Sequence, residues 1–329
     1  LSLHDALPIY QNNSYGLDEH CDNARDKIQE ALENYGVDIH FITGGTLTNL
    51  TFLSHALRPY EAVISADTGH INTHETGAIE ASGHKVLSIP CTDGKLTADL
   101  IRPVLKQHEN EHWVEPRLVY ISLPTELGTV YTKEELEKLY QFCKRHNLYL
   151  YIDGARLAMA LAVEETQLTL KDLPDLCDAF YIGGTKNGAM FGEALILVND
   201  DLKDHFRFNM KQRGAILAKG WMIGVQFEEL FQDNLYLELG KRSVALAQRL
   251  KQGFIDCKIP FLCDSPTNQL FPIFPNEFAK KINENYVTTF QCKPDENHTC
   301  LRFCTSWATN EQAVEDFIKD LKQWSYIYA

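Results

Sequence analysis

A regular alternation between short apolar runs and longer amphipathic segments constrains the fold of this 329-residue chain most strongly. From about residue 37, runs rich in β-branched and aromatic residues are each followed by a segment with helical periodicity. Strands that alternate with helices in this way form a mostly parallel sheet with helices on both faces. The predicted strands span residues 39–43, 62–66, 85–90, 118–124, 148–153 and 179–184. We therefore expect a large α/β domain.

The helices predicted between these strands differ in the strength of their signals. The segment 132–147 has the clearest pattern, because its apolar residues fall on one helical face. Thr132 and Glu135 at its start have the spacing of a capping box. The segments 49–57 and 70–83 are each predicted as one continuous helix.

The pattern changes near residue 233, which predicts a second, smaller unit of mixed α+β type. Its predicted helices span 235–256, 276–284 and 309–324, and its predicted strands span 261–264, 269–274, 288–292 and 300–305. Thr309 and Gln312 have capping-box spacing at the start of the last helix. These patterns divide the chain into a large domain at 10–232 and a small domain at 233–329.

The first nine residues are unlike the rest of the chain. They begin without Met, and no periodicity joins them to the segments that follow. We expect residues 1–9 to be a truncated or non-native start, and we leave them out of the fold.

The composition disfavours some classes of binding partner and indicates the cellular compartment. The chain has 31 Lys and Arg against 45 Asp and Glu, and its net charge of -14 disfavours nucleic acid and anionic membrane as partners. Its nine cysteines contain no C-x-x-C pair, which favours free thiols in a reducing compartment. No apolar run approaches the ~18 residues that a membrane span requires. We expect a cytoplasmic protein.

Polar residues just after the strands are the first candidates for a site, because open parallel sheets bind ligands beyond the carboxyl ends of their strands. Lys186 follows the strand 179–184 among glycines that permit close approach of a cofactor. A lysine that forms a Schiff base needs this placement, although a solvated loop lysine is the commoner explanation of Lys186 alone. Asp153 ends the strand 148–153, where a carboxylate can pair with a protonated pyridine ring or simply cap a turn.

Residues that follow two further strands are candidates for binding a phosphate group and for stacking on a pyridine ring. Gly45 and Thr46 open a helix, so their backbone amides and the hydroxyl group suit a single phosphate. His70 is placed to stack on a pyridine ring or to act as a base, and its spacing from His74, with Glu75 next, also raises the possibility of zinc. In H-E-x-x-H zinc sites the glutamate lies between the histidines, so we expect no metal.

Arg156 and Arg302 are candidates for binding a carboxylate, since a guanidinium group holds a carboxylate through two parallel hydrogen bonds. Strand alternation places Arg302 on the face opposite Leu301 and Phe303. An exposed surface arginine is the alternative for each.

The ordered motifs GGTLTNL, GHINTHETGAIEASG, YIDGARLAMAL and GGTKNGA resemble those of the threonine aldolase and β-eliminating lyase family, which are fold-type I pyridoxal phosphate enzymes. The resemblance runs from about residue 15 to residue 307. It implies a large PLP-binding α/β domain, a small C-terminal α+β domain, and homodimers or homotetramers that share active sites.

The resemblance also implies a role for each candidate residue. Lys186 carries pyridoxal 5'-phosphate as an internal aldimine, Asp153 pairs with the pyridinium nitrogen, and His70 stacks on the ring. The implied phosphate and cofactor contacts are Gly45, Thr46, Thr185, Arg156 and Lys211, although the alignment around Lys211 is loose. Arg156 and Arg302 are also the implied ligands of the substrate carboxylate.

The chain departs from the family in two places. Many threonine aldolases carry a histidine where this chain has Glu126, so His70, Glu126 and a bound water all remain candidates for the base. The family's N-terminal arm supplies a serine to the substrate site, and we expect this arm to be missing or replaced here.

The expected activity is a lyase reaction on a small amino acid. We expect cleavage of the Cα–Cβ bond of a β-hydroxy-α-amino acid such as L-threonine or L-allo-threonine, which yields glycine and an aldehyde. The alternatives are β-elimination on another amino acid, aldol cleavage of a phenylserine-type substrate, and a catalytically impaired member of the family.

Overall fold

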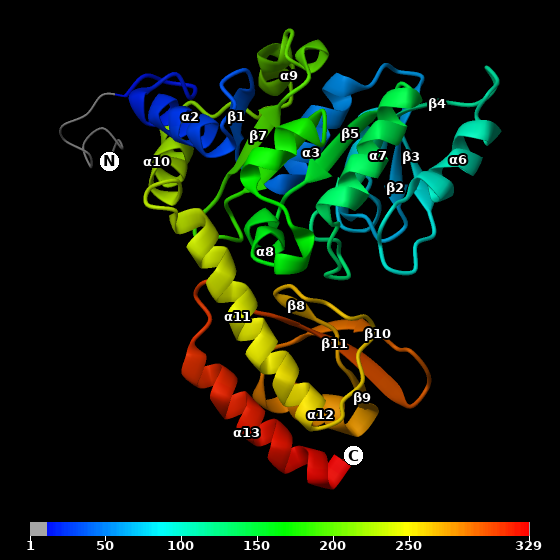
Figure 1. Ribbon diagram of the computed structural model, residues 1–329, viewed down its shortest axis with the longest axis vertical. Helices are drawn as coiled ribbons and strands as arrows, with labels where there is room; N and C mark the ends of the chain where they lie inside the picture. Colours follow the sequence, from blue (N-terminus) through cyan, green and yellow to red (C-terminus); the bar gives the residue numbers. More distant parts are fainter. Residues whose placement is uncertain (1–11, 329) are drawn as a thin grey trace.

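The computed structural model describes residues 12–328, so the predicted non-native start at 1–9 lies outside the described residues. A seven-stranded sheet forms the centre of the larger part of the chain (Figure 1). Its strands, from one edge to the other, are β3 (Lys85–Ile89), β2 (Glu61–Ala66), β4 (Glu115–Ser122), β5 (Tyr149–Asp153), β6 (Ala179–Gly183), β7 (Glu193–Leu197) and β1 (Asp38–Ile42). All neighbours from β3 to β6 are parallel, whereas β7 is antiparallel to both β6 and β1.

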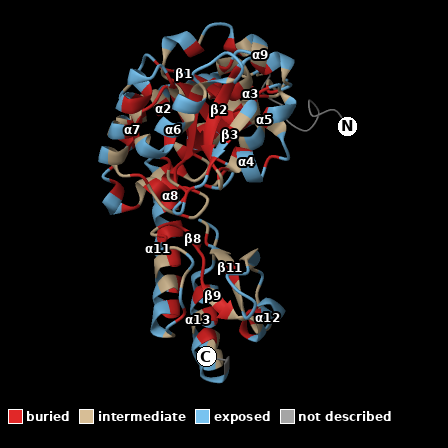
Figure 2. Cartoon of the chain, turned by 90° about the vertical axis from the view of Figure 1, so that its right-hand side faces the viewer, coloured by how far each residue is buried: buried red, intermediate tan, exposed pale blue. Residues whose placement is uncertain are grey.

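Helices cover both faces of this sheet, as its sequence predicts. In β6, Phe180 and Ile182 pack into one apolar cluster, while Ala179 and Tyr181 pack into the cluster on the opposite face. Figure 2 shows the buried residues concentrated along the sheet. The surrounding helices are α2 (Glu19–Leu32), α3 (Gly45–Ala56), α4 (His70–Thr73), α5 (Ala78–Ala81), α6 (Ala98–Gln107), α7 (Lys133–Arg145), α8 (Leu157–Leu161), α9 (Phe206–Gln212) and α10 (Trp221–Leu230).

A long helix, α11 (Leu235–Asp256), leads from this part of the chain to a smaller sheet (Figure 1). Gly240 of α11 packs against Ala158 of α8, and Gly253 packs against Ile318 of α13 (Glu311–Tyr328). The smaller sheet is antiparallel, with β11 paired to each of its other strands. Its elements are β8 (Gln269–Leu270), β9 (Ile273–Pro275), α12 (Asn276–Asn285), β10 (Thr289–Cys292) and β11 (His298–Cys304). The predicted fold class is confirmed.

The prediction of one continuous helix at 70–83 is wrong. Two short helices, α4 and α5, replace it. Thr76 and Gly77 between them have positive φ angles of 52° and 71°, and such left-handed residues end a right-handed helix. His70 therefore begins a single helical turn.

Two predictions about the smaller sheet are also wrong. The segment 261–264 forms only an isolated bridge between Phe261 and Pro272. The strand predicted at 269–274 is divided into β8 and β9 around Pro272, which has no N–H group to donate to a ladder.

The capping box predicted for the last helix is not formed. The N–H of Gln312 donates to the Asn310 side chain (2.8 Å), and the Thr309 hydroxyl accepts from the N–H of Ser306 (2.8 Å). The start of α13 is therefore capped one residue later than predicted.

The capping box predicted for α7 is confirmed and gives a test of local stability. The N–H of Glu135 donates to the Thr132 hydroxyl (3.2 Å), and the N–H of Thr132 donates to the Glu135 carboxylate (2.8 Å). We expect Thr132→Ala to lower the free energy of unfolding by about 1 kcal/mol, because it leaves a helix-end donor without its partner. Urea denaturation measures this loss, and an unchanged midpoint and slope would contradict it.

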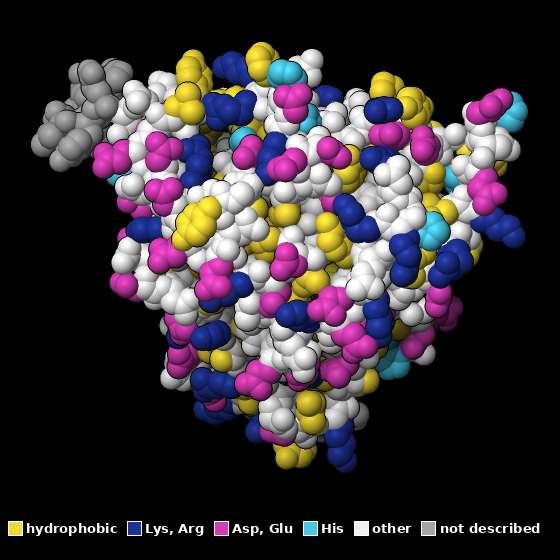
Figure 3. Space-filling model, turned by 45° about the horizontal axis from the view of Figure 1, so that its top comes forward, with side chains coloured by type: hydrophobic (Ala, Val, Ile, Leu, Met, Phe, Trp, Pro, Cys, Tyr) yellow, Lys and Arg dark blue, Asp and Glu magenta, His cyan; other side chains and the backbone are white. Residues whose placement is uncertain are grey.

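No helix among residues 12–328 is both long enough and apolar enough to span a bilayer. On the face shown in Figure 3, Lys and Arg side chains are interspersed with Asp and Glu side chains.

Candidate active site

Most of the predicted site residues lie just beyond the carboxyl ends of strands in the large sheet. Asp153 is the last residue of β5, and Lys186 lies three positions after the end of β6. Glu126 follows β4, His70 begins α4 after β2, and Gly45 begins α3 after β1. Because these strands run in one direction, the structure brings the five residues to the same edge of the sheet.

Asp153 is the buried residue to which several other residues of this site donate hydrogen bonds. Its carboxylate accepts hydrogen bonds from the hydroxyl groups of Tyr120 (2.5 Å) and Tyr181, the Asn49 amide (3.0 Å) and the N–H of Ala155 (3.0 Å). Burial, with the Asp153 charge, raises the pKa of both tyrosines, so their hydroxyls stay protonated donors. Within residues 12–328 no Lys or Arg forms an ion pair with Asp153. The buried carboxylate is thus held by neutral donors, and its place beside them suits a cationic ligand.

A hydrogen-bond network links this carboxylate to His70. The Asn49 amide donates to Asp153 and also to the Glu75 carboxylate (2.7 Å), which in turn lies 2.7 Å from Nδ1 of His70. The hydrogen bond to Glu75 raises the pKa of His70, and burial raises the pKa of Glu75. The network fixes the orientation of the His70 ring relative to Asp153.

Sequence reasoning did not assign Asn49 or Glu75 to the site. Asn49 lies one helical turn after Gly45 on α3, and Glu75 lies five positions after His70. Both belong to the motifs that carry the family resemblance, so motif membership was an available signal. Local periodicity alone does not show that α3 and the segment after α4 meet over Asp153.

The arrangement of His70 bears on the zinc alternative. His70, Glu75 and Asp153 each present a ligand atom within 4.8 Å of the others, so these residues have the composition of a possible metal site. His74 is not part of this group: its ring stacks on the His70 ring with centroids 5.4 Å apart, and its Nδ1 lies 2.6 Å from the Thr73 hydroxyl. The histidine pair therefore does not supply the H-x-x-x-H ligands that the spacing suggested, and the absence of a metal stays a prediction.

Glu126 lies beside His70 and has a second fixed contact. Its Oε1 accepts hydrogen bonds from the backbone N–H of His70 (2.9 Å) and from the Ser122 hydroxyl (2.6 Å). Burial raises the pKa of Glu126 to about 7, although the Ser122 hydrogen bond opposes this rise. A carboxyl group that titrates near neutrality is suited to accept a proton during turnover.

Lys186 has no hydrogen bond or ion pair with any residue of the described chain. Lys186 belongs to the exposed residues, but desolvation of its amine lowers the pKa of Lys186, and the Arg156 charge lowers it further. The adjacent loop is held by β7, where the Glu193 carboxylate accepts from the N–H of Gly184 (2.8 Å). The Thr185 hydroxyl accepts from the N–H of Gly192 (3.1 Å). Lys186 thus has the free, more readily deprotonated amine that a nucleophilic lysine needs.

The amino end of α3 presents unsatisfied backbone donors at the site. Gly44, the residue before the helix, has extended backbone and offers no capping side chain, and the first turn carries no acidic residue. A Cβ atom at Gly45 would come 3.1 Å from the Tyr181 hydroxyl, so the chain approaches closely there. Thr46 is exposed next to it. A helix end of this kind is a general binding site for a phosphate group.

Arg156 and Arg302 approach the site from different parts of the chain. Arg156 precedes α8, directly after the Asp153 strand end, and Arg302 belongs to β11 of the smaller sheet. Neither guanidinium group forms an ion pair or a hydrogen bond with a residue at 12–328, and Nε of Arg302 is buried without a partner. The charges of both arginines lower the pKa of His74, which places them around the same space. Two unpaired guanidinium groups here form a receptor for an anion.

The structure does not bring Lys211 to the other predicted residues. Lys211 lies on α9 with its Nζ 4.5 Å from the centre of the Tyr15 ring. The Nζ of Lys211 forms no hydrogen bond or ion pair with another residue of the described part.

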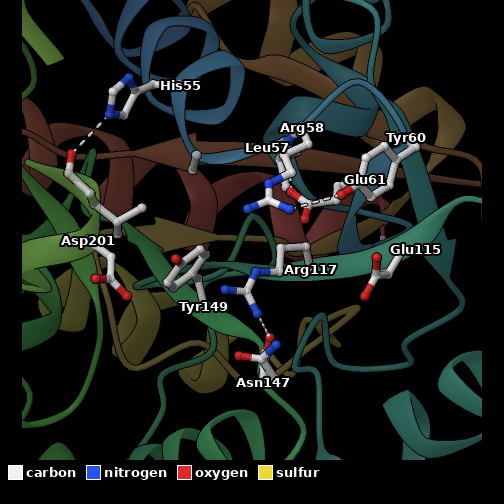
Figure 4. A pocket seen from close by; sticks show the side chains of 12 residues that line it. His55, Leu57, Arg58, Tyr60, Glu61, Glu115, Arg117, Asn147, Tyr149 and Asp201 are labelled. Carbon is white, nitrogen blue, oxygen red and sulfur yellow. Dashed lines mark hydrogen bonds between the residues drawn. The ribbon is translucent and has the colours of Figure 1, made fainter. Parts of the chain in front are cut away.

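A separate pocket of about 350 Å³ lies at the amino ends of β2, β4 and β5, at the opposite edge of the sheet (Figure 4). Arg117 in this pocket donates to the Asn147 carbonyl and stacks 4.4 Å from the Tyr149 ring centre, while Arg58 donates to the Tyr60 hydroxyl (3.0 Å). None of the predicted site residues lines it. The predicted catalytic side chains lie at the other edge of the sheet.

The sequence of this chain is similar to those of known proteins. A family model described as β-eliminating lyase matches residues 9–274. The chain is 31% identical to the low specificity L-threonine aldolase of Pseudomonas sp. over 321 residues, which cover 94% of this chain and 89% of that protein.

Solved structures show the same likeness in three dimensions. A Leishmania major threonine aldolase structure shares 50% sequence identity and superposes with a TM-score of 0.95, covering 98% of this chain and 94% of that one. A structure described as SPT with PLP has a TM-score of 0.71 at 11% identity, covering 96% of this chain and 80% of that one, and shows a shared fold only.

Proposed function

Because the chain belongs to the β-eliminating lyase family, we propose that it binds pyridoxal 5'-phosphate and cleaves the Cα–Cβ bond of a β-hydroxy-α-amino acid such as threonine. One observation carries this proposal. A buried carboxylate without a cationic partner, a free lysine amine of lowered pKa, and two unpaired arginines meet at one sheet edge. The Leishmania and Pseudomonas relatives named as threonine aldolases support the choice of substrate class.

The residues present fit the proposed cofactor. Lys186 would bind its aldehyde carbon, Asp153 would hold a proton on its pyridine nitrogen, and His70 would stack on its ring. The backbone amides at Gly45 and Thr46 would hold its phosphate. We keep Thr185 as a proposed further contact of the cofactor, whereas Lys211, which lies on α9 against Tyr15, is not kept in this role.

When bound, pyridoxal phosphate supplies a cationic ring that accepts the electron pair released from a broken bond at Cα. The chain's own residues then determine which bond breaks. Arg156 and Arg302 bind the substrate carboxylate from two sides, because both guanidinium groups lack a carboxylate of the chain itself. Holding the carboxylate there fixes the orientation of the Cα–Cβ bond relative to the ring.

Cleavage of that bond also requires removal of the proton from the β-hydroxyl group. Glu126 fits this role best, since its pKa is raised to about 7 and its carboxyl group lies beside His70. The hydrogen bond to Glu75 raises the pKa of His70, so a larger share of its rings is already protonated at neutral pH and cannot accept a proton. His70 and a bound water remain the alternatives.

This assignment predicts a pH dependence with a defined sign. Below about pH 7 Glu126 is protonated and cannot accept a proton, so kcat should rise as the pH increases through 7. Glu126→Gln, which is neutral at every pH, should remove this rise and lower kcat by about 100-fold. Ser122→Ala removes a donor that stabilises the charged form, so it should move the inflection to higher pH. A Glu126→Gln variant with the wild-type pH profile would return the role to His70 or water.

We also propose that the chain works as a cytoplasmic homodimer or homotetramer with a large domain at 10–232 and a small domain at 233–329. All nine cysteines are free, which fits a reducing compartment. Met190, four positions after Lys186, is 87% exposed, and Met222 and Val225 are exposed on α10. Apolar side chains exposed beside the site suit a contact with a second subunit. Light scattering coupled to gel filtration measures the mass of the assembly.

A kinetic assay tests the proposed activity. The purified protein is loaded with pyridoxal phosphate and supplied with L-threonine, L-allo-threonine or phenylserine, and the aldehyde product is coupled to NADH oxidation by an alcohol dehydrogenase. We expect aldehyde and glycine to form in equal amounts from at least one of these substrates. Release of ammonia and an oxoacid such as pyruvate, with serine or cysteine as substrate and no aldehyde from any of the three, would instead favour β-elimination.

A further inference from the structure

The hairpin formed by β10 and β11 brings two cysteines together. Cys292 on β10 and Cys300 on β11 are register partners in this antiparallel pair, directly after an irregularity in the register between Phe290 and Cys292. The Cys300 thiol donates a hydrogen bond to the Phe271 carbonyl (3.5 Å), and Cys292 is close enough to influence its pKa. Cys300 is buried, whereas Cys292 is partly exposed to solvent. One thiol of the pair is therefore accessible to a small reagent, and the other lies against it.

The backbone geometry of this pair suits a disulfide. Directly opposed residues of antiparallel strands have Cα atoms about 4.5 or 5.5 Å apart. Disulfides span Cα separations of about 4.4–6.8 Å, so a bond between these two cysteines requires little movement of the strands.

The other cysteines nearby are placed differently. The Cys263 thiol is close enough to influence Cys300, but it donates its hydrogen bond to the Leu127 carbonyl (3.0 Å). Cys304 is exposed further along β11, where it accepts from the Asn268 amide (3.5 Å). Cys304 thus provides a thiol on the same strand without an opposed cysteine.

We propose that Cys292 and Cys300 are an oxidation site, and that they form a reversible disulfide when the protein meets hydrogen peroxide. The Cys292 sulfur attacks one peroxide oxygen and breaks the O–O bond, which releases water and leaves a sulfenic acid on Cys292. The Cys300 sulfur then attacks the Cys292 sulfur, and the hydroxyl group leaves with the Cys300 proton as a second water. Two thiols are oxidised to a disulfide, and one peroxide is reduced to two waters.

The order of attack follows from exposure. Burial raises the pKa of the Cys300 thiol to about 12, so few Cys300 thiolates are available to react first with peroxide. The disulfide would tie β10 to β11 two residues before Arg302, whose register partner on β10 is Thr289. The oxidation site therefore lies on the strand that carries one of the proposed carboxylate ligands.

Peptide mapping tests this proposal without reference to enzymatic activity. The reduced protein is treated with a small excess of hydrogen peroxide, its remaining thiols are blocked with iodoacetamide, and the digest is analysed by mass spectrometry. We expect a linked peptide pair containing Cys292 and Cys300, lighter by two hydrogens than the reduced pair, and its loss after dithiothreitol. Cys300→Ser should leave Cys292 as a sulfenic acid that dimedone traps.

Cys304→Ser is the matched control, because it removes a more exposed thiol from the same strand and should leave the yield of the linked pair unchanged. Circular dichroism checks that each serine variant keeps the secondary structure of the parent. The proposal is overturned if Cys304 is oxidised while Cys292 and Cys300 stay reduced, or if Cys300 pairs with Cys263 instead.

Discussion

Lys186→Ala is expected to lower the rate of aldehyde release by at least about 1,000-fold, equivalent to ~4 kcal/mol of activation free energy. Lys186 is a free amine of lowered pKa at the carboxyl edge of the sheet, with no hydrogen bond or ion pair within the described chain. Its replacement removes the nucleophile that holds the cofactor covalently. The same variant should lose the visible absorbance of the bound cofactor, because alanine cannot attach to its aldehyde.

Borohydride reduction followed by peptide mapping locates the attachment directly. In the wild-type protein the cofactor should be recovered as a stable amine on the peptide that contains Lys186. Lys106→Ala, which changes an exposed lysine on α6, should keep both the attachment and the activity. Recovery of the cofactor on a different lysine of the wild-type chain would contradict the assignment.

Asp153→Asn is expected to reduce kcat/KM by about 100-fold, which corresponds to ~3 kcal/mol, the scale of breaking a buried ion pair. Asparagine nearly preserves the shape of the side chain but removes the charge that would keep a proton on the pyridine nitrogen. It also presents an amide group to donors such as Tyr120 and Tyr181, which now face the carboxylate. Steady-state kinetics at saturating cofactor measure the loss.

Tyr120→Phe is the matched control for this change. It removes one hydrogen bond to Asp153 but keeps the carboxylate charge, so it should cost only about tenfold in kcat/KM. If Asp153→Asn kept the wild-type kcat, or if both variants had equal effects, the charge of Asp153 would not be its contribution to catalysis.

The large sheet and the positions of Lys186 and Asp153 at its edge followed from the sequence, for a geometric reason. Parallel strands separated by helices all end at one edge, so a residue's position after its strand predicts where it lies. The strand ends alone determine these positions, and β5 and β6 end where the predicted strands end to within a residue. The antiparallel strand β7, which holds the Lys186 loop through Glu193, was not assigned.

Local sequence patterns do not predict the hydrogen-bond network around His70. Asn49 and Glu75 meet because α3 packs beside the segment after α4, and this contact depends on tertiary packing. The break at Thr76 and Gly77 was hidden because only one of these two left-handed residues is a glycine. The cap of α13 was misplaced because Asn310 competes with Thr309 for the same role.

The most direct test of the central claim uses L-threonine labelled with carbon-13 at both Cα and Cβ, supplied to the cofactor-loaded protein and followed by NMR. Aldol cleavage breaks the bond between the two labels, so we predict singly labelled glycine and singly labelled acetaldehyde without carbon–carbon coupling. A product that is an oxoacid and retains the coupling between the two labels would show that the bond stays intact, and it would contradict the proposed reaction.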